Sequence, residues 1–395
     1  MADRATGINP EMLRWAREQA GFPTVEAVAI RLKRPVFQVE AWESGLESPT
    51  WRQLELLARE IYHRPTALFF LPTPPEEQTP TAEFRRLPET ALDDLEPDTW
   101  LAIRQAKARQ MDLEELAPFD DSLERLIVRD LAGGVIPDGV DSLAREARTY
   151  LGVSLDDQFA WKSADVALES WRDAVQAVGI WVFKRHFRQK DVAGFCLNGT
   201  DRPIVYLNNG QQKVRQIFTL FHELAHLLYG FNHLERSNID HYVEELVGHD
   251  KDVEVACNRF AGEFLVPTDH FLEFASPEIT TGITDDKLVS LARHYRVSRE
   301  VVLRKCLNQN WIDQQFYEDK VKEWRSGYPE DSNRGTGGNY YSTQGTYLGE
   351  KYTTLAFRGY YQGAYGVDQL SEYLDIKASS FVGLENWLNS RRASR

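Results

Sequence analysis

The chain has 395 residues, of which 42% are hydrophobic and 27% charged, and these proportions exclude a wholly disordered or fibrous protein. A chain of this length is expected to fold as two or three domains. The formal net charge of −14 excludes strong nonspecific adhesion to nucleic acid over the whole surface, so any contact with DNA must be local.

The three cysteines, Cys196, Cys257 and Cys306, are an odd number and lie far apart, which argues against a disulfide framework or a cysteine zinc site. We interpret them as ordinary buried thiols. The N-terminus lacks a basic segment followed by an apolar core of signal-peptide length, and no run of about 18 apolar residues occurs. The sequence therefore predicts a cytoplasmic protein with no membrane partner.

Residues 8–71 have the pattern of several short helices, with glycines and prolines at their expected ends. The segment 72–82, PTPPEEQTPTA, is rich in proline and has no apolar face, which is typical of a stiff extended linker. We therefore predict a five-helix domain at 1–75 and a linker at 76–90.

The central part of the chain combines helices with a few strands. Residues 91–178 are predicted to be mainly helical, whereas three short runs within 179–209, GIWVFKR, AGFCL and PIVYLNN, are rich in Val, Ile, Phe and Trp and predict a small antiparallel sheet. Further helices are expected at 213–229, 252–265 and, as a pair, 285–307. We assign 91–310 to one domain.

The C-terminal part, 311–395, contains a stretch between Ser326 and Gly345 that is dense in Gly, Ser, Thr, Asn and Tyr and predicts a surface loop. The remaining tail has the pattern of a compact helical subdomain. Together these elements predict an α+β protein that is mostly helical and has one small sheet.

The segment FTLFHELAHLLYG carries the clearest chemical pattern in the chain. His222 and His226 are four residues apart and therefore lie on one face of a helix. A catalytic zinc ion takes three protein ligands and a water, and it lowers the pKa of that water to about 7. Glu223 stands next to His222, where it can accept a proton from the water and pass it to a leaving amine.

The alternative interpretation is an apolar core helix in which two histidines and a glutamate coincide by chance. Phe218, Leu224 and Leu227 surround these polar residues, and burying them among apolar side chains without a metal is costly. We therefore predict a metal site, with Zn²⁺ as the ion and Mn²⁺ as the alternative.

The motif does not fix the third ligand. In the pattern H-E-x-x-H-x-x-G-x-x-H, glycine and histidine would stand at positions 229 and 232, but Gly230 and His233 each fall one residue late. Glu254 is the better candidate, because EVACNRFAGEFL has the pattern of a helix in which Glu254 and Asn258 share a face. Asn258 would then be a polar neighbour of the ligand. The other candidates are, first, His233 and then His241, Glu244, Glu245 and His249.

The segments AGFCL, PIVYLNN, RQIFTLFHELAHLLYG and EVACNRFAGEFLVP, in this order, resemble the ImmA/IrrE family of metallopeptidases. In that family a strand pair precedes an H-E-x-x-H helix, and a later helix carries an E-x-x-x-N/D-x-F-A core. The resemblance implies a zincin-like peptidase domain with a gluzincin-like third ligand. Its implied site residues are the metal ligands His222, His226 and Glu254, the catalytic base Glu223 and the polar residue Asn258. Cys257 stands where family members often carry alanine or another small residue.

The N-terminal segment is similar to the helix-turn-helix of XRE-type repressors, notably at Trp42-Glu43-x-Gly45 and Ser48-Pro49-Thr50. The ImmA/IrrE family often carries such a module ahead of the peptidase. In the DNA-binding interpretation, the helix that begins near Pro35 enters the major groove. Gln38 then reads bases, and Lys33 and Arg34 contact phosphates.

The composition of this module also supports a different interpretation. Through residue 75 there are nine Lys and Arg and nine Asp and Glu, so their formal charges cancel, whereas DNA-binding domains usually have a basic face. The predicted reading helix also contains Val36, Phe37 and Val39. A helix-turn-helix kept for packing or for protein contact is therefore the alternative to DNA binding.

Two functions follow from these patterns. The first is a regulatory zinc metalloendopeptidase that cleaves a specific intracellular protein, with DNA as a second partner of residues 1–75. The resemblance implies roles in transcription regulation through repressor cleavage, in stress response, or in toxin–antitoxin pairs, so we expect a repressor- or toxin-like substrate. The alternative is a non-catalytic transcriptional regulator or antitoxin-like protein that keeps the zinc fold as a scaffold. Glu223 favours the enzyme, because a scaffold needs no general base.

Overall fold

The computed structural model describes residues 3–75, 95–120, 125–131, 139–189, 191–199, 202–236, 248–279, 282–326 and 339–393. The linker predicted at 76–90 and residues 327–338 of the loop predicted between Ser326 and Gly345 lie outside these residues. Residues 340–345 belong to the helix Tyr340–Leu348, which Asn339 caps by accepting the backbone N–H of Tyr341, so the loop prediction is wrong there. The chain divides into two compact units, which are described separately. Unit 1 comprises Met1–Lys107 with Phe187–Gln189, and unit 2 comprises Ala108–His186 with Lys190–Arg395. The domain boundaries at residues 75, 90 and 310 stay predictions.

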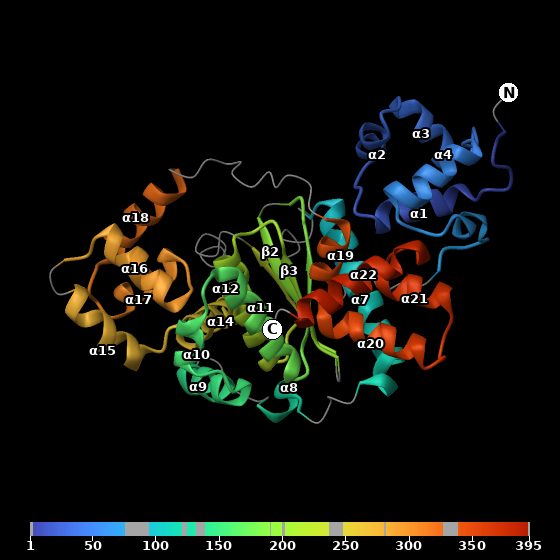
Figure 1. Ribbon diagram of the computed structural model, residues 1–395. Helices are drawn as coiled ribbons and strands as arrows, with labels where there is room; N and C mark the ends of the chain where they lie inside the picture. Colours follow the sequence, from blue (N-terminus) through green and yellow to red (C-terminus); the bar gives the residue numbers. More distant parts are fainter. Residues whose placement is uncertain are drawn as a thin grey trace. The chain divides into compact units, whose positions relative to one another are not determined.

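Unit 1 begins with short helical segments over the residues where the sequence predicts them (Figure 1). They are α1 (Pro10–Gln19), α2 (Val25–Leu32), α3 (Val36–Glu43), α4 (Trp51–Leu56), the π-helix η1 (Leu57–Ile61) and the 3-10 helix η2 (Thr66–Phe70). Asn9, Thr24 and Thr50 accept backbone N–H groups at the starts of α1, α2 and α4. These caps satisfy donors that a helix leaves free in its first turn, and so they set where the helices begin.

The core of these helices is apolar except for one ion pair. Met12, Trp42 and Leu54 are at most 2% exposed. Arg17 on α1 donates from Nε to a carboxylate oxygen of Glu43 on α3 at 2.9 Å, and both side chains are buried. The inner face of α3 is therefore fixed against α1, and Glu43 is not a surface charge.

Unit 2 is built around a mixed four-stranded sheet with the order β1-β3-β2-β4. Its strands are β1 (Trp181–Arg185), β2 (Val192–Leu197), β3 (Ile204–Asn208) and β4 (His233–Arg236). β2 pairs antiparallel with both β3 and β4, whereas β1 pairs parallel with β3. The prediction of a wholly antiparallel sheet is therefore wrong for β1. Short apolar runs with short connections favour hairpins between consecutive strands. Here the neighbour of β1 in the sheet is β3 and not β2, and β1 and β3 run in the same direction.

Helices make up the rest of unit 2, and α7 (Pro97–Leu116) runs into it from unit 1. Before the sheet come η3 (Ala117–Phe119), α8 (Ile127–Asp130), α9 (Val140–Leu151), α10 (Leu155–Ala160) and α11 (Ala164–Ala177). After β3 come α12 (Lys213–Leu228), α14 (His249–Leu265), α15 (Thr268–Ile279), α16 (Asp285–Tyr295), α17 (Arg299–Asn308) and α18 (Gln314–Ser326). The C-terminal helices are α19 (Tyr340–Leu348), α20 (Glu350–Tyr361), α21 (Val367–Leu374), the 3-10 helix η4 (Ala378–Ser380) and α22 (Phe381–Ala393).

The prediction of a mostly helical α+β protein is confirmed. In the described part of the chain, no helix combines the length and the apolar character needed to cross a membrane. The three cysteines are buried free thiols, as the sequence predicts.

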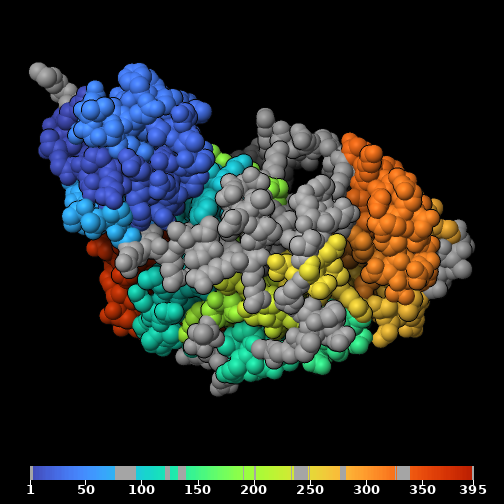
Figure 2. Space-filling view, turned by 180° about the vertical axis from the view of Figure 1, so that it is seen from behind, coloured from blue at the N-terminus to red at the C-terminus, as the bar shows by residue number. Residues whose placement is uncertain are grey.

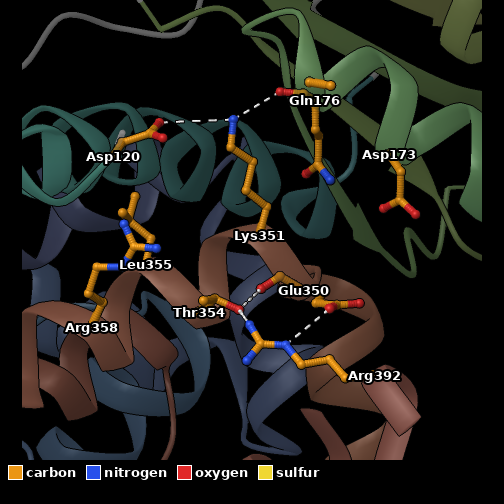
Figure 3. Close-up of a pocket in the computed structure, with 10 residues that line it drawn as sticks. Asp120, Asp173, Gln176, Glu350, Lys351, Thr354, Leu355, Arg358 and Arg392 are labelled. Atoms are coloured by element: carbon orange, nitrogen blue, oxygen red, sulfur yellow. Dashed lines mark hydrogen bonds and ion pairs between the residues drawn. The ribbon is translucent and has the colours of Figure 1, made fainter. Parts of the chain in front are cut away.

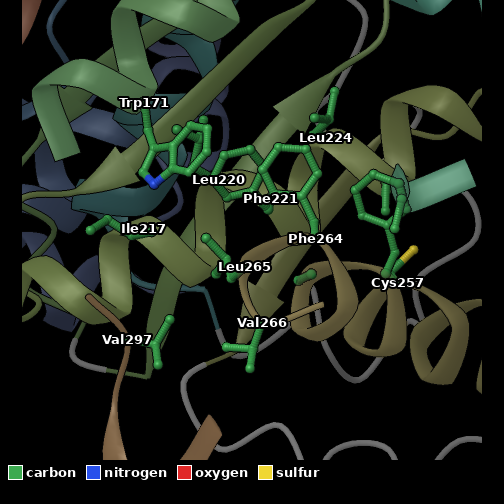
Figure 4. Packing of buried hydrophobic residues seen from close by; sticks show 14 of the residues in the cluster. Trp171, Ile217, Leu220, Phe221, Leu224, Cys257, Phe264, Leu265, Val266 and Val297 are labelled. Carbon is green, nitrogen blue, oxygen red and sulfur yellow. The ribbon is translucent and has the colours of Figure 1, made fainter. Parts of the chain in front are cut away.

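The main core of unit 2 lies where α12 packs on α14 and on the sheet. Trp171 on α11 meets Phe221 on α12 edge to face, with ring centroids 4.9 Å apart, and Phe221 stacks on Phe264 of α14 at 4.0 Å (Figure 4). Through these ring contacts, α12 packs between α11 and α14. The aromatic packing therefore fixes the helix that carries the H-E-x-x-H motif.

Candidate metal centre

The predicted metal-site residues of α12 lie on the part of the helix that packs against α14. His222 and Glu223 are 0% exposed and His226 is 1% exposed. The aromatic residues described above hold α12 in this position, so the two imidazoles have little freedom to move. Burial of three ionisable side chains next to one another is unusual and calls for a chemical reason.

Glu254 completes a compact group with the two histidines. It comes from the second turn of α14 and is 6% exposed. Its carboxylate oxygens lie 3.4 Å from Nε2 of His222 and 3.2 Å from Nε2 of His226. The two Nε2 atoms are 3.0 Å apart, and one donor atom from each of the three residues lies within 4.8 Å of the others.

Asn258 supports this group from α14, one helical turn after Glu254. Its Oδ1 atom lies 3.0 Å from Nδ1 of His222. When the His222 hydrogen is on Nδ1, that nitrogen donates to Asn258, and the lone pair of Nε2 points toward Glu254 and His226. Asn258 is therefore a positioning residue for the His222 imidazole.

Cys257 lies between Glu254 and Asn258 in sequence and is fully buried. Burial, together with the negative charges of Glu254 and Glu223, raises the pKa of the Cys257 thiol well above its usual value. Cys257 therefore stays a neutral thiol, which packs like a small apolar side chain.

The three candidate ligands fit a divalent transition metal. Two imidazole nitrogens and one carboxylate are a ligand set that catalytic zinc takes, with a further position left for water. Burying three such polar donors within 4.8 Å of one another costs desolvation free energy, which a bound cation would offset. Among the residues that the structure describes, this is the one group of three or more His, Cys, Asp and Glu arranged in this way.

The structure does not test the other third-ligand candidates, because their side chains are not among those that it describes. The backbone of His233 begins β4, and that of His249 begins α14, but their side chains are not described. His241, Glu244 and Glu245 lie outside the described residues. The choice of Glu254 therefore rests on its own position between the two histidines.

The residues predicted for DNA binding lie in unit 1. Lys33 has a left-handed backbone, with φ of 53°, in the turn between α2 and α3. Lys33 and Arg34 are exposed, whereas Gln38 on α3 is half-buried. The largest exposed side chain of α3 is Phe37, at 71%, so an apolar group occupies the surface of the predicted reading helix.

One residue that supports the site was not singled out from the sequence. A Cβ atom on Gly194 of β2 would lie 2.7 Å from Cγ2 of Thr219 on α12 and 2.7 Å from the backbone oxygen of Tyr206. Only glycine lets α12 approach the sheet this closely. A glycine inside a strand pattern is the sequence feature that could have predicted this close approach.

A second polar region of unit 2 is a cavity of about 520 Å³ between α11, α20 and α22 (Figure 3). Two of its charged side chains bond to its own walls. Lys351 donates to the backbone oxygen of Gln176 at 2.9 Å, and Arg392 donates to Oγ1 of Thr354 at 2.7 Å. We therefore interpret this cavity as part of the attachment of the C-terminal helices to α11.

Comparison with known proteins bears on this metal centre. Residues 175–307 match the Peptidase_M78 family, the IrrE N-terminal-like domain. The matched segment contains the whole sheet, α12 and α14, and so it contains every residue of the candidate metal group. The match supports the resemblance to the ImmA/IrrE family and indicates a metallopeptidase domain. No curated protein matches the chain, and the XRE-type resemblance of the N-terminal segment stays a prediction.

Proposed function

We propose that this chain is a regulatory, zinc-dependent metalloendopeptidase that cleaves a specific repressor- or toxin-like protein. One observation carries the proposal. His222, His226 and Glu254 converge next to the buried Glu223, within the segment that matches a metallopeptidase family.

His222 and His226 would bind the metal through their Nε2 atoms, and Glu254 would bind it through its carboxylate. When bound, zinc polarises the scissile carbonyl and lowers the pKa of a water. Asn258 holds the His222 ring in the orientation that this binding needs.

Glu223 is the proposed catalytic base. Its carboxylate accepts a proton from water while the water oxygen forms a bond to the carbonyl carbon of the substrate. Glu223 then gives the proton to the amide nitrogen as the carbon–nitrogen bond breaks, so the products are a carboxylic acid and an amine. Because Glu223 is 0% exposed, bulk water competes little for this proton.

The substrate is proposed to be one protein, not peptides in general. A peptidase without discrimination would damage its own cell, so docking or a trigger must restrict it. Residues 1–107 of unit 1 lie outside the segment that matches the peptidase family. A module that holds the substrate raises the local concentration of its cleavage site, which is the role that we propose for unit 1.

We propose protein contacts, and not DNA contacts, for residues 1–75. Their formal charges cancel, and Phe37 stands exposed on α3. DNA binding through Lys33, Arg34 and Gln38 is the alternative. A gel-shift titration with salt on the upstream region of the gene tests it, and binding by so few basic residues would have a shallow salt dependence.

Mapping new protein N-termini in cells tests the proposed activity. Cells with the wild-type chain should contain at least one cleaved protein that is intact in cells with Glu223→Gln. Glu146→Gln, at an exposed position on α9, is the matched control and should behave as wild type. Unchanged regulation and unchanged N-termini with Glu223→Gln would favour the non-catalytic regulator.

A further inference from the structure

The cavity between α11, α20 and α22 of unit 2 holds one polar group that the attachment of the C-terminal helices does not explain. Gln176 on α11 lines the cavity and is 3% exposed. Its Oε1 atom is buried and accepts no hydrogen bond from the part of the chain that the structure describes. In Figure 3 the carboxamide of Gln176 extends from α11 toward Glu350 of α20. A buried amide oxygen without a partner costs free energy, so a donor that reaches it from the cavity would be bound favourably.

The two walls of the cavity carry opposite charge. The α11 wall contributes Asp173 and the neutral Gln176, and none of its residues that line the cavity is basic. The wall formed by α20 and α22 contributes one acidic and three basic side chains, which are Glu350, Lys351, Arg358 and Arg392. Figure 3 shows the α11 side chains on one side of the cavity and the two arginines on the other. A ligand with a positive group at one end and a negative group at the other therefore fits.

The basic groups differ in what they can still bind. Nζ of Lys351 lies 3.9 Å from a carboxylate oxygen of Asp120, so its charge is balanced within the protein. The side chain of Arg392 is 49% exposed. Its Nε donates to Glu350 at 3.4 Å, and one terminal nitrogen donates to Thr354 at 2.7 Å. A guanidinium group has five N–H donors, so Arg392 can bind the carboxylate of a ligand as well.

Asp120 supplies the third side of the cavity. It follows η3, whose residues lie beside the C-terminal helices, as the adjoining teal and red surfaces in Figure 2 show. With Asp120 the cavity is lined by three acidic and three basic side chains, so their formal charges cancel. A strongly anionic ligand such as a nucleotide would lie against three carboxylates, whereas a ligand without net charge would not be repelled.

We propose that this cavity binds a small zwitterion, either a free amino acid or a short peptide. The ammonium group of the ligand donates to Oε1 of Gln176 and lies beside the carboxylate of Asp173. The carboxylate of the ligand accepts from Arg392. The cavity volume of about 520 Å³ is within the range of small-molecule sites. A ligand this small should bind with a dissociation constant of roughly 10–1,000 µM.

Isothermal titration calorimetry of the metal-loaded, full-length Glu223→Gln protein tests the proposal. This variant should not hydrolyse peptides, and the substitution does not alter the lining of the cavity. Alanyl-leucine or leucine should bind at one site per chain, and the tighter of the two identifies the source of the zwitterion. The N-acetylated form of that ligand lacks the ammonium group, and its C-terminal amide lacks the carboxylate. Each should bind roughly tenfold more weakly or worse.

Two further substitutions in this protein test the contacts in the cavity. Gln176→Leu keeps the approximate size of the side chain and removes the acceptor, so it should weaken binding roughly tenfold or more without lowering Tm. Arg392→Gln should also weaken the zwitterion. It should not weaken the C-terminal amide further, because that form lacks the carboxylate that Arg392 binds. Arg293→Gln, at an exposed position on α16, is the matched control and should leave binding unchanged.

A protein that binds neither alanyl-leucine nor leucine would overturn the proposal. Binding that Gln176→Leu and Arg392→Gln leave unchanged would do the same, because the ligand would then lie outside this cavity. None of these measurements uses peptide hydrolysis. Failure of the cavity site and failure of the proposed peptidase activity are therefore separate results.

Discussion

Asn258 on α14 lies with its Oδ1 atom 3.0 Å from Nδ1 of His222 on α12. The bond joins the two helices that supply all three candidate ligands. It also selects the nitrogen of His222 that faces the other two ligands. The metal group is therefore held by a contact between helices as well as by the ligands themselves.

Asn258→Ala should weaken metal binding by roughly 10- to 100-fold, because the His222 ring loses the group that orients it. Competition with a chelator measures this affinity. Asn389→Ala, at an exposed position on α22, should bind metal as the wild type does. Equal affinities in all three proteins would remove Asn258 from the site.

Glu254→Ala should lose stoichiometric metal, because two imidazoles alone leave the site one ligand short. His233→Ala should keep the metal. Elemental analysis of the purified variants distinguishes the two candidates. Metal loss in His233→Ala and retention in Glu254→Ala would reassign the third ligand to His233.

Two glycines allow a matched test of the packing that positions α12. Gly194→Ala should destabilise the protein by about 1–3 kcal/mol, because the new Cβ would meet Thr219 and the backbone of Tyr206. Gly262→Ala on α14, where no atom other than those of its chain neighbours and its own helix backbone lies within 4 Å of the new Cβ, should be neutral or stabilise by up to about 1 kcal/mol. Urea denaturation, monitored by a spectroscopic signal that arises from unit 2, measures the free energy of unfolding of both variants. A neutral Gly194→Ala would mean that α12 can move away from the sheet without cost.

More of the metal site than of the surrounding fold could be predicted from the sequence. The spacing of His222 and His226 needs only the helix period, and Glu254 and Asn258 share a face by the same rule. These are local relationships within α12 and within α14. The contact between the two helices, which brings Glu254 to the histidines, follows from packing that no local pattern encodes.

The sheet shows the opposite case. Three of the four strands lie where the sequence predicts them, whereas β4 (His233–Arg236) was not predicted. The pairing of β1 with β3, which is parallel, was not predicted either. Strand order is a long-range choice, and alternating apolar residues carry no information about it. In the same way, the sequence favours a core position for both Trp42 and Phe37, and this is wrong for Phe37, which is 71% exposed, because α3 turns Val39 and Trp42 toward the core.

The ionised carboxylate of Glu169 on α11 is expected to stabilise the fold, and this contribution should be lost in acid. Burial would raise its pKa, but the positive charges of Arg172, Lys184 and Arg391 outweigh burial and lower the pKa to about 2. Burial lowers the pKa of Lys184 to about 8, so Lys184 stays charged in acid. Glu169 therefore contributes stability above its unfolded pKa of 4.5, and this is lost as the pH falls toward 2.

Glu169→Gln should remove up to roughly 3 kcal/mol of stability at pH 6 and less at pH 3. Thermal unfolding at both pH values measures the difference between variant and wild type. Asp165→Asn on the same helix is the control, because its side chain is 74% exposed. A variant that lowers Tm equally at both pH values would contradict the ionised role of Glu169.

The most direct test of the account combines metal content with hydrolysis in purified wild-type protein and in Glu223→Gln. The substrate is the protein whose cleavage is found by mapping N-termini in cells. The account predicts one zinc per chain in both proteins, and hydrolysis by the wild type alone, because glutamine keeps the shape of Glu223 but cannot accept the proton. Absence of stoichiometric metal in the wild type, or cleavage by Glu223→Gln at the wild-type rate, would contradict it.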